Sequence, residues 1–145
     1  MNLVRCRLDP GDSATTIELC GTTISLTPSV FARHPRLREH LGSSVIVGIR
    51  PEDLADAALL PGSNGSCLDV DVALAEPLGA ELIAHFPLSG NSSGAAESAD
   101  LQETAGTTLT ARLSPLSSAR AGRRLRLAVN VDRLHFFEET TGQQI

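Results

Sequence analysis

Apolar and polar residues alternate one by one over most of the short segments of this chain, and this period of two constrains the fold more than any other feature. In the first segment, "LVRCRLD", Val4, Cys6 and Leu8 alternate with arginines. Alternation predicts a half-buried β-strand, because successive side chains of a strand point to opposite faces. The remaining strands are expected within 15–26, 43–49, 67–86, 107–113, 124–130 and 133–145. Short strands with Gly, Pro and Ser between them are typical of an all-β barrel or of paired small sheets.

Local signals refine three of these segments. In "TTIELCGTTISL" two apolar pairs flank Gly21, which predicts a β-hairpin with its turn near that glycine. In "PSVFARHPRLREHL" one short helix is expected, with Pro35 breaking it. The segment 67–86 is expected to hold two strands joined at 77–79, with Val70, Val72 and Leu74 on one face of the first.

Composition excludes several classes of function. All 12 basic residues among the 145 are arginine, and a phosphate-binding loop of the form G-x-x-x-x-G-K-[ST] requires lysine. The sequence therefore contains no ATP-hydrolysing core of this type, and no catalytic residue is expected. The formal net charge of −5 and the presence of only four aromatic residues, all phenylalanine, argue against a nucleic-acid partner.

No metal or cofactor is expected in this chain. The four histidines, His34, His40, His85 and His135, do not have the spacing of metal ligands. The three cysteines form no C-x-x-C pair and are expected to be free thiols in a reducing compartment. No segment is apolar enough to cross a membrane, so the chain is expected to be cytoplasmic.

Two groups of charged residues keep alternative interpretations open. Glu52, Asp53 and Asp56 follow Pro51, where acids stabilise the first turn of a helix, although paired carboxylates can also perform acid-base chemistry. Between 120 and 126, four arginines alternate on a strand. They can form an anion site or simply keep an edge strand charged and free of aggregation.

Three ordered motifs resemble a known family. "VIVGIRPEDL" contains Gly48, Ile49, Arg50, Pro51 and Glu52. "VALAEPLGAELIAHF" contains Glu76, Leu78, Gly79 and Glu81, and "LRLAVNVDRLHFFEETTG" contains Asp132, His135, Phe136, Phe137 and Gly142. Together they resemble the C-terminal regulatory domain, called the transport-associated OB or TOBE domain, of ATP-binding subunits of carbohydrate-importing ABC transporters of the maltose and glycerol-phosphate type.

The resemblance covers almost the whole chain and implies both a fold and a role. It implies one domain over 1–145, an OB-like β-barrel with an additional small β-element and one short helix, and a flexible loop over 89–106. The ATPase domain, with its ATP and Mg²⁺, is absent from this chain, and the opening "MN" resembles the point at which that domain ends. The implied role is to pair with a second copy as a homodimer and to receive regulatory signals.

The implied partners are the ATPase domain, the transmembrane permease subunits and a regulatory protein or metabolite. The implied location is the cytoplasmic side of the inner membrane, through the transporter complex. The expected regulatory or dimer-interface residues are Arg50, Pro51, Glu52, Glu76, Gly79 and Glu81. From the same residues we expect a buried or interfacial ion-pair corner, in which Glu52 and either Glu76 or Glu81 bind the Arg50 guanidinium.

An alternative role is a free-standing module that binds an oxyanion such as molybdate. The "GSNGS" loop and the arginines at 120–126 favour it.

Overall fold

A computed structural model describes residues 1–60, 66–88 and 107–145 and confirms an all-β, OB-like domain. Its strands are β1 (Asn2–Arg7), β2 (Asp9–Pro10), β3 (Thr15–Leu19), β4 (Thr22–Ser25), β5 (Ser44–Ile49), β6 (Leu54–Asp56), β7 (Cys67–Asp71), β8 (Leu74–Pro77), β9 (Leu82–Pro87), β10 (Thr108–Leu113), β11 (Arg124–Val129) and β12 (His135–Glu138). The flexible loop expected over 89–106 lies outside the described residues.

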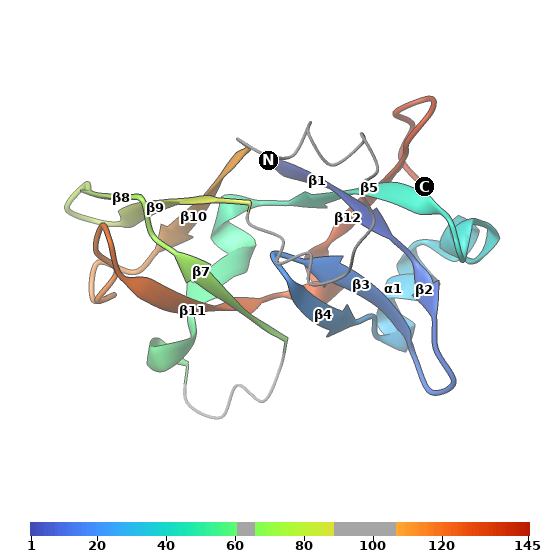
Figure 1. Ribbon diagram of the computed structural model, residues 1–145, viewed down its shortest axis with the longest axis horizontal. Helices are drawn as coiled ribbons and strands as arrows, with labels where there is room; N and C mark the ends of the chain where they lie inside the picture. The colour runs from blue at the N-terminus through green and yellow to red at the C-terminus, as the bar shows by residue number, and fades with distance from the viewer. Residues whose placement is uncertain (61–65, 89–106) are drawn as a thin grey trace.

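The described strands form four small sheets, and every strand pairing is antiparallel (Figure 1). Their orders are β1-β5-β12, β10-β9-β8, β6-β11-β7 and β2-β3-β4. The side-chain amide of Asn2 joins two of them: its Nδ2 donates to the Thr110 carbonyl at 2.7 Å, and its Oδ1 accepts from the Thr110 N–H at 2.9 Å. Asn2 thereby provides hydrogen-bond partners for two backbone groups on the outer edge of β10.

One α-helix is present in the described part of the chain, α1 (Pro28–Arg33), and Pro35 separates it from the 3₁₀ turn η1 (Pro35–His40), as expected. The other 3₁₀ turns are η2 (Pro51–Asp53), η3 (Ala57–Leu59) and η5 (Val131–Arg133). None of the described helices combines the length and the apolar character that crossing a bilayer requires.

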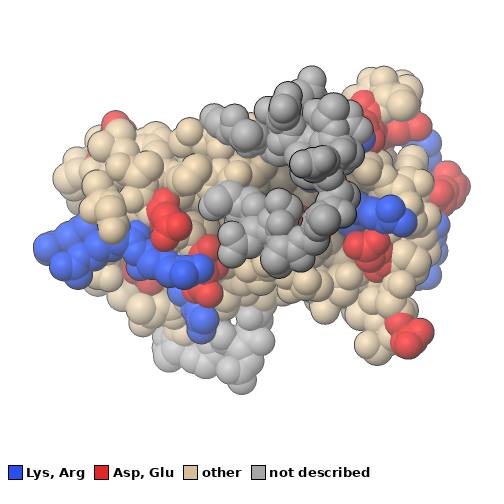
Figure 2. Space-filling model, viewed as in Figure 1, with Lys and Arg blue, Asp and Glu red and all other residues tan. Residues whose placement is uncertain are grey.

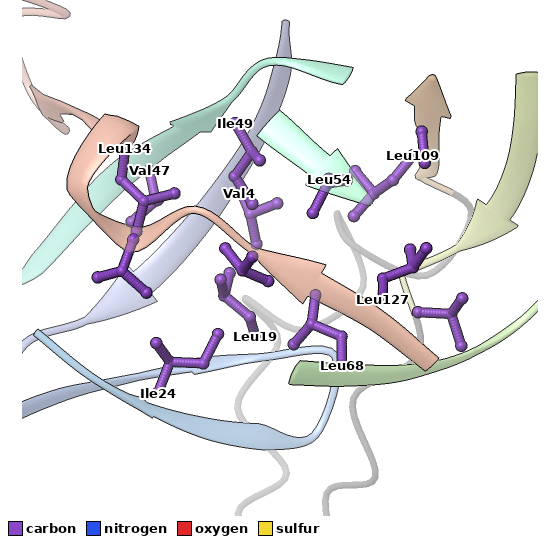
Figure 3. Packing of buried hydrophobic residues seen from close by; sticks show 14 of the residues in the cluster. Val4, Leu19, Ile24, Val47, Ile49, Leu54, Leu68, Leu109, Leu127 and Leu134 are labelled. Atoms are coloured by element: carbon purple, nitrogen blue, oxygen red, sulfur yellow. The ribbon is translucent and has the colours of Figure 1, made fainter. Parts of the chain in front are cut away.

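The hydrophobic core is one cluster to which all four sheets contribute. Figure 3 shows Val4 of β1, Ile24 of β4, Leu68 of β7 and Leu109 of β10 converging on it. On β1 the alternation expected from the sequence is confirmed, because Val4 and Cys6 are buried and the intervening Arg5 is exposed. Burial of one face per strand is what stabilises strands this short.

The hairpin is confirmed between β3 and β4. Its two turn residues, Cys20 and Gly21, both have positive φ, 48° and 74°. A two-residue turn with both φ values positive matches the right-handed twist of the strands it joins.

The structure corrects the expectation that Val70, Val72 and Leu74 lie on one face of a single strand. Leu74 does not share the buried face of Val70 and Val72, because its side chain is 48% exposed. The chain changes partner at this point: the Val72 N–H donates to the Arg123 carbonyl, whereas the Ala73 N–H donates to the His85 carbonyl. It leaves the sheet of β7 and enters the sheet of β8 here, so a single alternation does not continue through it.

The arginine-bearing strand is also placed differently from the expectation. β11 is the central strand of its sheet, between β6 and β7, and not an edge strand.

Candidate functional site: the Arg50 corner, a basic pocket and an open sheet face

The strand β5 ends at the Arg50-Pro51 step because proline begins a 3₁₀ turn there. Arg50 keeps an extended backbone, with φ −73° and ψ 141°, as the residue before a proline does. Pro51 is the first residue of η2, and the Asp53 N–H donates to the Arg50 carbonyl at 2.9 Å to close the turn. The corner therefore redirects the chain from β5 into β6.

The expected buried ion-pair corner around Arg50 is wrong. Arg50 and Glu52 are exposed, and the Arg50 guanidinium forms no ion pair with any described residue. Glu81 instead pairs with Arg112, and Glu76 lies beside His85. The physical reason is that Glu76 lies in β8 and Glu81 in the β8-β9 turn, where His85 of β9 and Arg112 of β10 stand beside them.

Asp53 is the buried acid of this corner. Its side chain is 6% exposed, and Arg133 Nε lies 3.1 Å from Asp53 Oδ1. The Asn130 N–H donates to the Asp53 carbonyl at 3.0 Å. The other carboxylate oxygen, Oδ2, is buried and accepts no hydrogen bond from the described residues. Asp53 thus joins η2 to η5, a contact that nothing in the local sequence signalled.

The neighbouring acid Asp56 is structural as well. It is 4% exposed, and its carboxylate accepts from the Ala58 N–H at 3.0 Å and from the Ser117 hydroxyl at 2.6 Å. It therefore caps η3 and anchors the segment before β11.

A basic pocket lies beside the Arg50 corner. Its volume is about 450 Å³, and it is lined by Arg33, His34, Arg50, Arg133, Leu134, His135 and Gln144. The end of α1, the end of β5, the η5-β12 segment and Gln144, which follows β12, bring these residues together. Sequence reasoning singled out Arg50 and His135 separately and missed the pocket, because its side chains come from four segments of the chain.

The two histidines of the basic pocket have defined surroundings. His34 is buried, with Nδ1 2.8 Å from the Ile145 carbonyl oxygen and its ring edge-on to Phe136 at a centroid distance of 5.2 Å. Burial lowers the pKa of His135, and the nearby Arg50 guanidinium lowers it further. The neutral imidazole is therefore favoured, because a positive charge would be poorly solvated and would face another positive charge.

The motif residues meet in space at Gly48. A Cβ atom at Gly48 would lie 2.5 Å from Met1 Sδ and 3.0 Å from Phe137 Cε2. In the paired register Gly48 stands opposite His135. The first and third motifs are therefore two halves of one packing contact between β5 and β12, and a side chain at 48 would disturb it.

The second motif forms one end of the β8-β9-β10 sheet. Gly79 has φ 84° in the β8-β9 turn, which the Leu78 N–H closes by donating to the Glu81 carbonyl at 2.8 Å. A positive φ of this size favours glycine. Glu81 binds Arg112 of β10 from the end of this turn.

The outer face of this sheet carries exposed and half-buried side chains. Leu82, Ala84 and Phe86 of β9 point into the core, so Ile83 and His85 point outward. His85 Nε2 lies 3.5 Å from Glu76 Oε2, too far for a good hydrogen bond. Exposed Leu74 and Leu78, at 48% and 59%, stand on this face and at its turn. We call these exposed and half-buried residues the outer face: Leu74, Glu76, Leu78, Glu81, Ile83, His85, Thr110 and Arg112.

Two of the four arginines at 120–126 stand beside carboxylates of β7. Arg126 binds both carboxylate oxygens of Asp69 across the β7-β11 pair, and Arg124 stands opposite Asp71. Figure 2 shows basic and acidic side chains intermingled at the end of the molecule where β7 and β11 lie. The hydrogen bond from Arg126 lowers the pKa of Asp69. Most of the "GSNGS" loop lies outside the described residues.

Comparisons with known proteins agree with the resemblance. Residues 1–54 match the family model described as the MalK OB fold domain. All 145 residues align with the sn-glycerol-3-phosphate import ATP-binding protein UgpC of Ralstonia nicotianae at 28% identity, covering 34% of that protein. They also align with the sulfoquinovosyl glycerol transport ATP-binding protein SmoE of Agrobacterium fabrum at 33% identity, covering 33% of it.

A third relative is the trehalose/maltose import ATP-binding protein MalK of Thermococcus litoralis, 30% identical over 110 residues that make up 73% of this chain and 25% of the relative. The chain thus spans about a third or less of the length of these curated relatives. The resemblance drawn from the motifs is confirmed: the chain is an OB-like domain related to the ATP-binding subunits of carbohydrate-importing ABC transporters.

Proposed function

We propose that this chain is a non-catalytic regulatory and self-association domain of the ATP-binding subunit of a carbohydrate importer. One observation carries the proposal: the full 145 residues align with proteins named as import or transport ATP-binding proteins, yet they contain no lysine and hence no phosphate-binding loop. ATP, Mg²⁺ and hydrolysis then belong to an ATPase domain outside these residues. The chain would reach the inner membrane through that domain and the permease subunits.

The outer face is the surface that we propose for self-association. It combines exposed Leu74 and Leu78 with half-buried Ile83, and its charged residues are already paired or placed beside one another. Apolar side chains with a paired polar rim are typical of protein interfaces. Pro77 ends β8 without an N–H group, which disfavours adding a strand at that edge. The two copies would therefore meet face to face about a two-fold axis, each offering the same residues.

The Arg50 corner is the second surface of the proposal. Arg50 and Glu52 are exposed, Pro51 holds the turn between them, and they lie on a different sheet from Glu76, Gly79 and Glu81. We assign the corner to regulatory contacts and the second motif to pairing. Two separate surfaces allow a regulator to bind without displacing the second copy.

The experiment that tests self-association is sedimentation velocity on the chain from micromolar to millimolar concentration. We expect a reversible dimer that the Leu78→Asp variant weakens by about tenfold or more, because an unpaired carboxylate would enter the apolar contact. Leu41→Asp is the matched control, since Leu41 is 39% exposed and lies after η1, outside the outer face. A monomer at all concentrations, or equal weakening by Leu41→Asp, would contradict the assignment.

A second experiment tests membership in an ATP-binding subunit. We expect the reading frame of the gene to encode a G-x-x-x-x-G-K-[ST] segment on the N-terminal side of residue 1. We also expect the full product to bind ATP. A stop codon directly upstream would count against this part of the proposal and would leave the self-association result intact.

A further inference from the structure

The basic pocket concentrates positive charge without carboxylates among its lining residues. Three guanidinium groups, from Arg33, Arg50 and Arg133, share its lining with two imidazoles. No Asp or Glu lines it in the part of the chain that the structure describes. Like charges held in one cavity repel one another, and a bound anion relieves that repulsion.

Most donors of these guanidinium groups remain available. Each arginine carries five N–H donors. Arg33 uses Nη1 to donate to the Asp132 carbonyl, and Arg133 uses Nε beside Asp53. The Arg50 guanidinium has no hydrogen-bond or ion-pair partner among the described residues. The pocket thus offers several convergent donors that nothing within the described chain occupies.

Neighbouring contacts hold the lining in place. His34, only 9% exposed, is fixed by the Ile145 carbonyl at 2.8 Å and by the edge-on contact with Phe136. Asp53 orients Arg133, and Pro51 fixes the backbone direction at Arg50. A preorganised set of donors loses little conformational entropy when an anion binds.

The size of the pocket limits the ligand. A volume of about 450 Å³ falls in the range of small-molecule sites, roughly 300–1,000 Å³. It accommodates a tetrahedral oxyanion with a small organic substituent. Guanidinium groups bind phosphate oxygens in pairs through their planar fork of donors.

We propose that the basic pocket binds a small phosphate-bearing molecule, with Arg50 as its principal donor and Arg33 and Arg133 as supporting donors. The site is separate from the outer face, and the proposal therefore goes beyond the self-association function. It shares Arg50 with the corner assigned to regulatory contacts and, resting on that part of the proposed function, names the class of ligand that the corner would receive.

The test is calorimetric titration of the chain with inorganic phosphate and with methyl phosphate, at constant ionic strength set by chloride. We expect saturable binding that Arg50→Gln weakens by about tenfold or more, the loss expected for a hydrogen bond to a charged group. The matched control is Arg120→Gln, which removes the same charge from an exposed arginine outside the pocket and should leave the affinity unchanged. Equal affinities for the two probes would show that the pocket recognises the phosphate group itself. Tighter binding of methyl phosphate than of inorganic phosphate would show that it recognises a phosphomonoester.

Nuclear magnetic resonance of the imidazole groups gives the location. We expect the signals of His34 and His135 to shift on addition of methyl phosphate in the unmodified chain, and to need about tenfold more methyl phosphate for the same shift in Arg50→Gln. The proposal is overturned by the absence of saturable binding, by unchanged affinity in a folded Arg50→Gln variant, or by equal loss in Arg120→Gln. The Leu78→Asp variant should bind both probes normally, so failure of self-association would leave this result unaffected.

Discussion

Asp53 buries its carboxylate beside Arg133, while Arg50, three residues earlier, keeps its guanidinium in solvent. The difference follows from the turn that Pro51 starts, which directs residue 53 inward toward η5. A buried carboxylate needs a partner, because its desolvation is costly when it stands alone. An exposed arginine has no such requirement and stabilises the fold little.

Removal of the Arg133 charge should therefore destabilise the chain more than removal of the Arg50 charge. We expect Arg133→Gln to lower the free energy of unfolding by about 1–2 kcal/mol, because Asp53 would remain buried without its ion partner. Arg50→Gln, the matched control, should change it by no more than about 0.5 kcal/mol. The double variant Asp53→Asn with Arg133→Gln should recover part of the loss in urea denaturation. Equal effects of the two single variants would show that the Asp53-Arg133 pair does not stabilise the fold.

The buried thiols make stability depend on alkaline pH. Burial raises the pKa of Cys20 to about 11, and burial together with nearby Cys20 and Glu18 raises the pKa of Cys6 to about 12. Thiols of the unfolded chain ionise near their ordinary pKa of 9.0, so the unfolded state loses these protons first as the pH rises. The stabilisation is complete below about pH 9 and is lost between about pH 9 and about pH 12.

We expect the free energy of unfolding to fall by up to roughly 7 kcal/mol across that window, at about 1.4 kcal/mol for each pKa unit, measured by urea denaturation. The chain contains no lysine and no tyrosine, so few other side chains titrate there. The Cys20→Ala variant should show a shallower fall than the unmodified chain. An identical pH profile in that variant would exclude Cys20 as a source of the pH dependence of stability.

At the scale of elements, turn chemistry sets the register of β3 and β4. Cys20 and Gly21 both occupy the left-handed region, where most side chains are strained and glycine is not. The register that follows places Ile17 opposite Ile24, with both side chains in the core. A shift by one residue would turn both faces over and expose these side chains.

Gly21→Ala should lower the free energy of unfolding by about 1 kcal/mol, the strain of a side chain at this φ of 74°. Gly21→Asn is the control. Asparagine adopts positive φ more readily than alanine does, so this variant should lose less free energy of unfolding than Gly21→Ala. Thermal denaturation of both variants gives the comparison. Equal losses would indicate that crowding at the turn, and not backbone strain, decides the effect.

At the scale of the whole molecule, the four sheets share one hydrophobic core and two of them are joined through Asn2 and Thr110. None of the sheets has more than three described strands, which is close to the minimum for independent stability. Each sheet depends on the others to cover its apolar face. The single domain expected over 1–145 from the resemblance stays a prediction, and this shared core supports it.

Unfolding should therefore be one cooperative transition. We expect far-ultraviolet circular dichroism and differential scanning calorimetry to give coincident transitions, with a van't Hoff enthalpy equal to the calorimetric enthalpy. Amide hydrogens in β5, β9 and β11 should show similar maximal protection against exchange. Two separate transitions would mean that the sheets form more than one cooperative unit.

The local sequence by itself determined most of the strands, although not β2 or β6, together with the hairpin turn at Gly21, the break at Pro35 and the redirection of the chain at Pro51. Each depends on side-chain alternation or on the backbone limits of glycine and proline, which act within a few residues. The three motifs were also sufficient to indicate the family.

The tertiary structure alone decided which charges meet. Asp53 pairs with Arg133, Glu81 pairs with Arg112, and the basic pocket assembles from four segments of the chain. Such pairings depend on strand order and on the change of sheet between Val72 and Ala73. No local pattern encodes the strand order or this change of sheet, because both depend on burying one core that the whole chain shares.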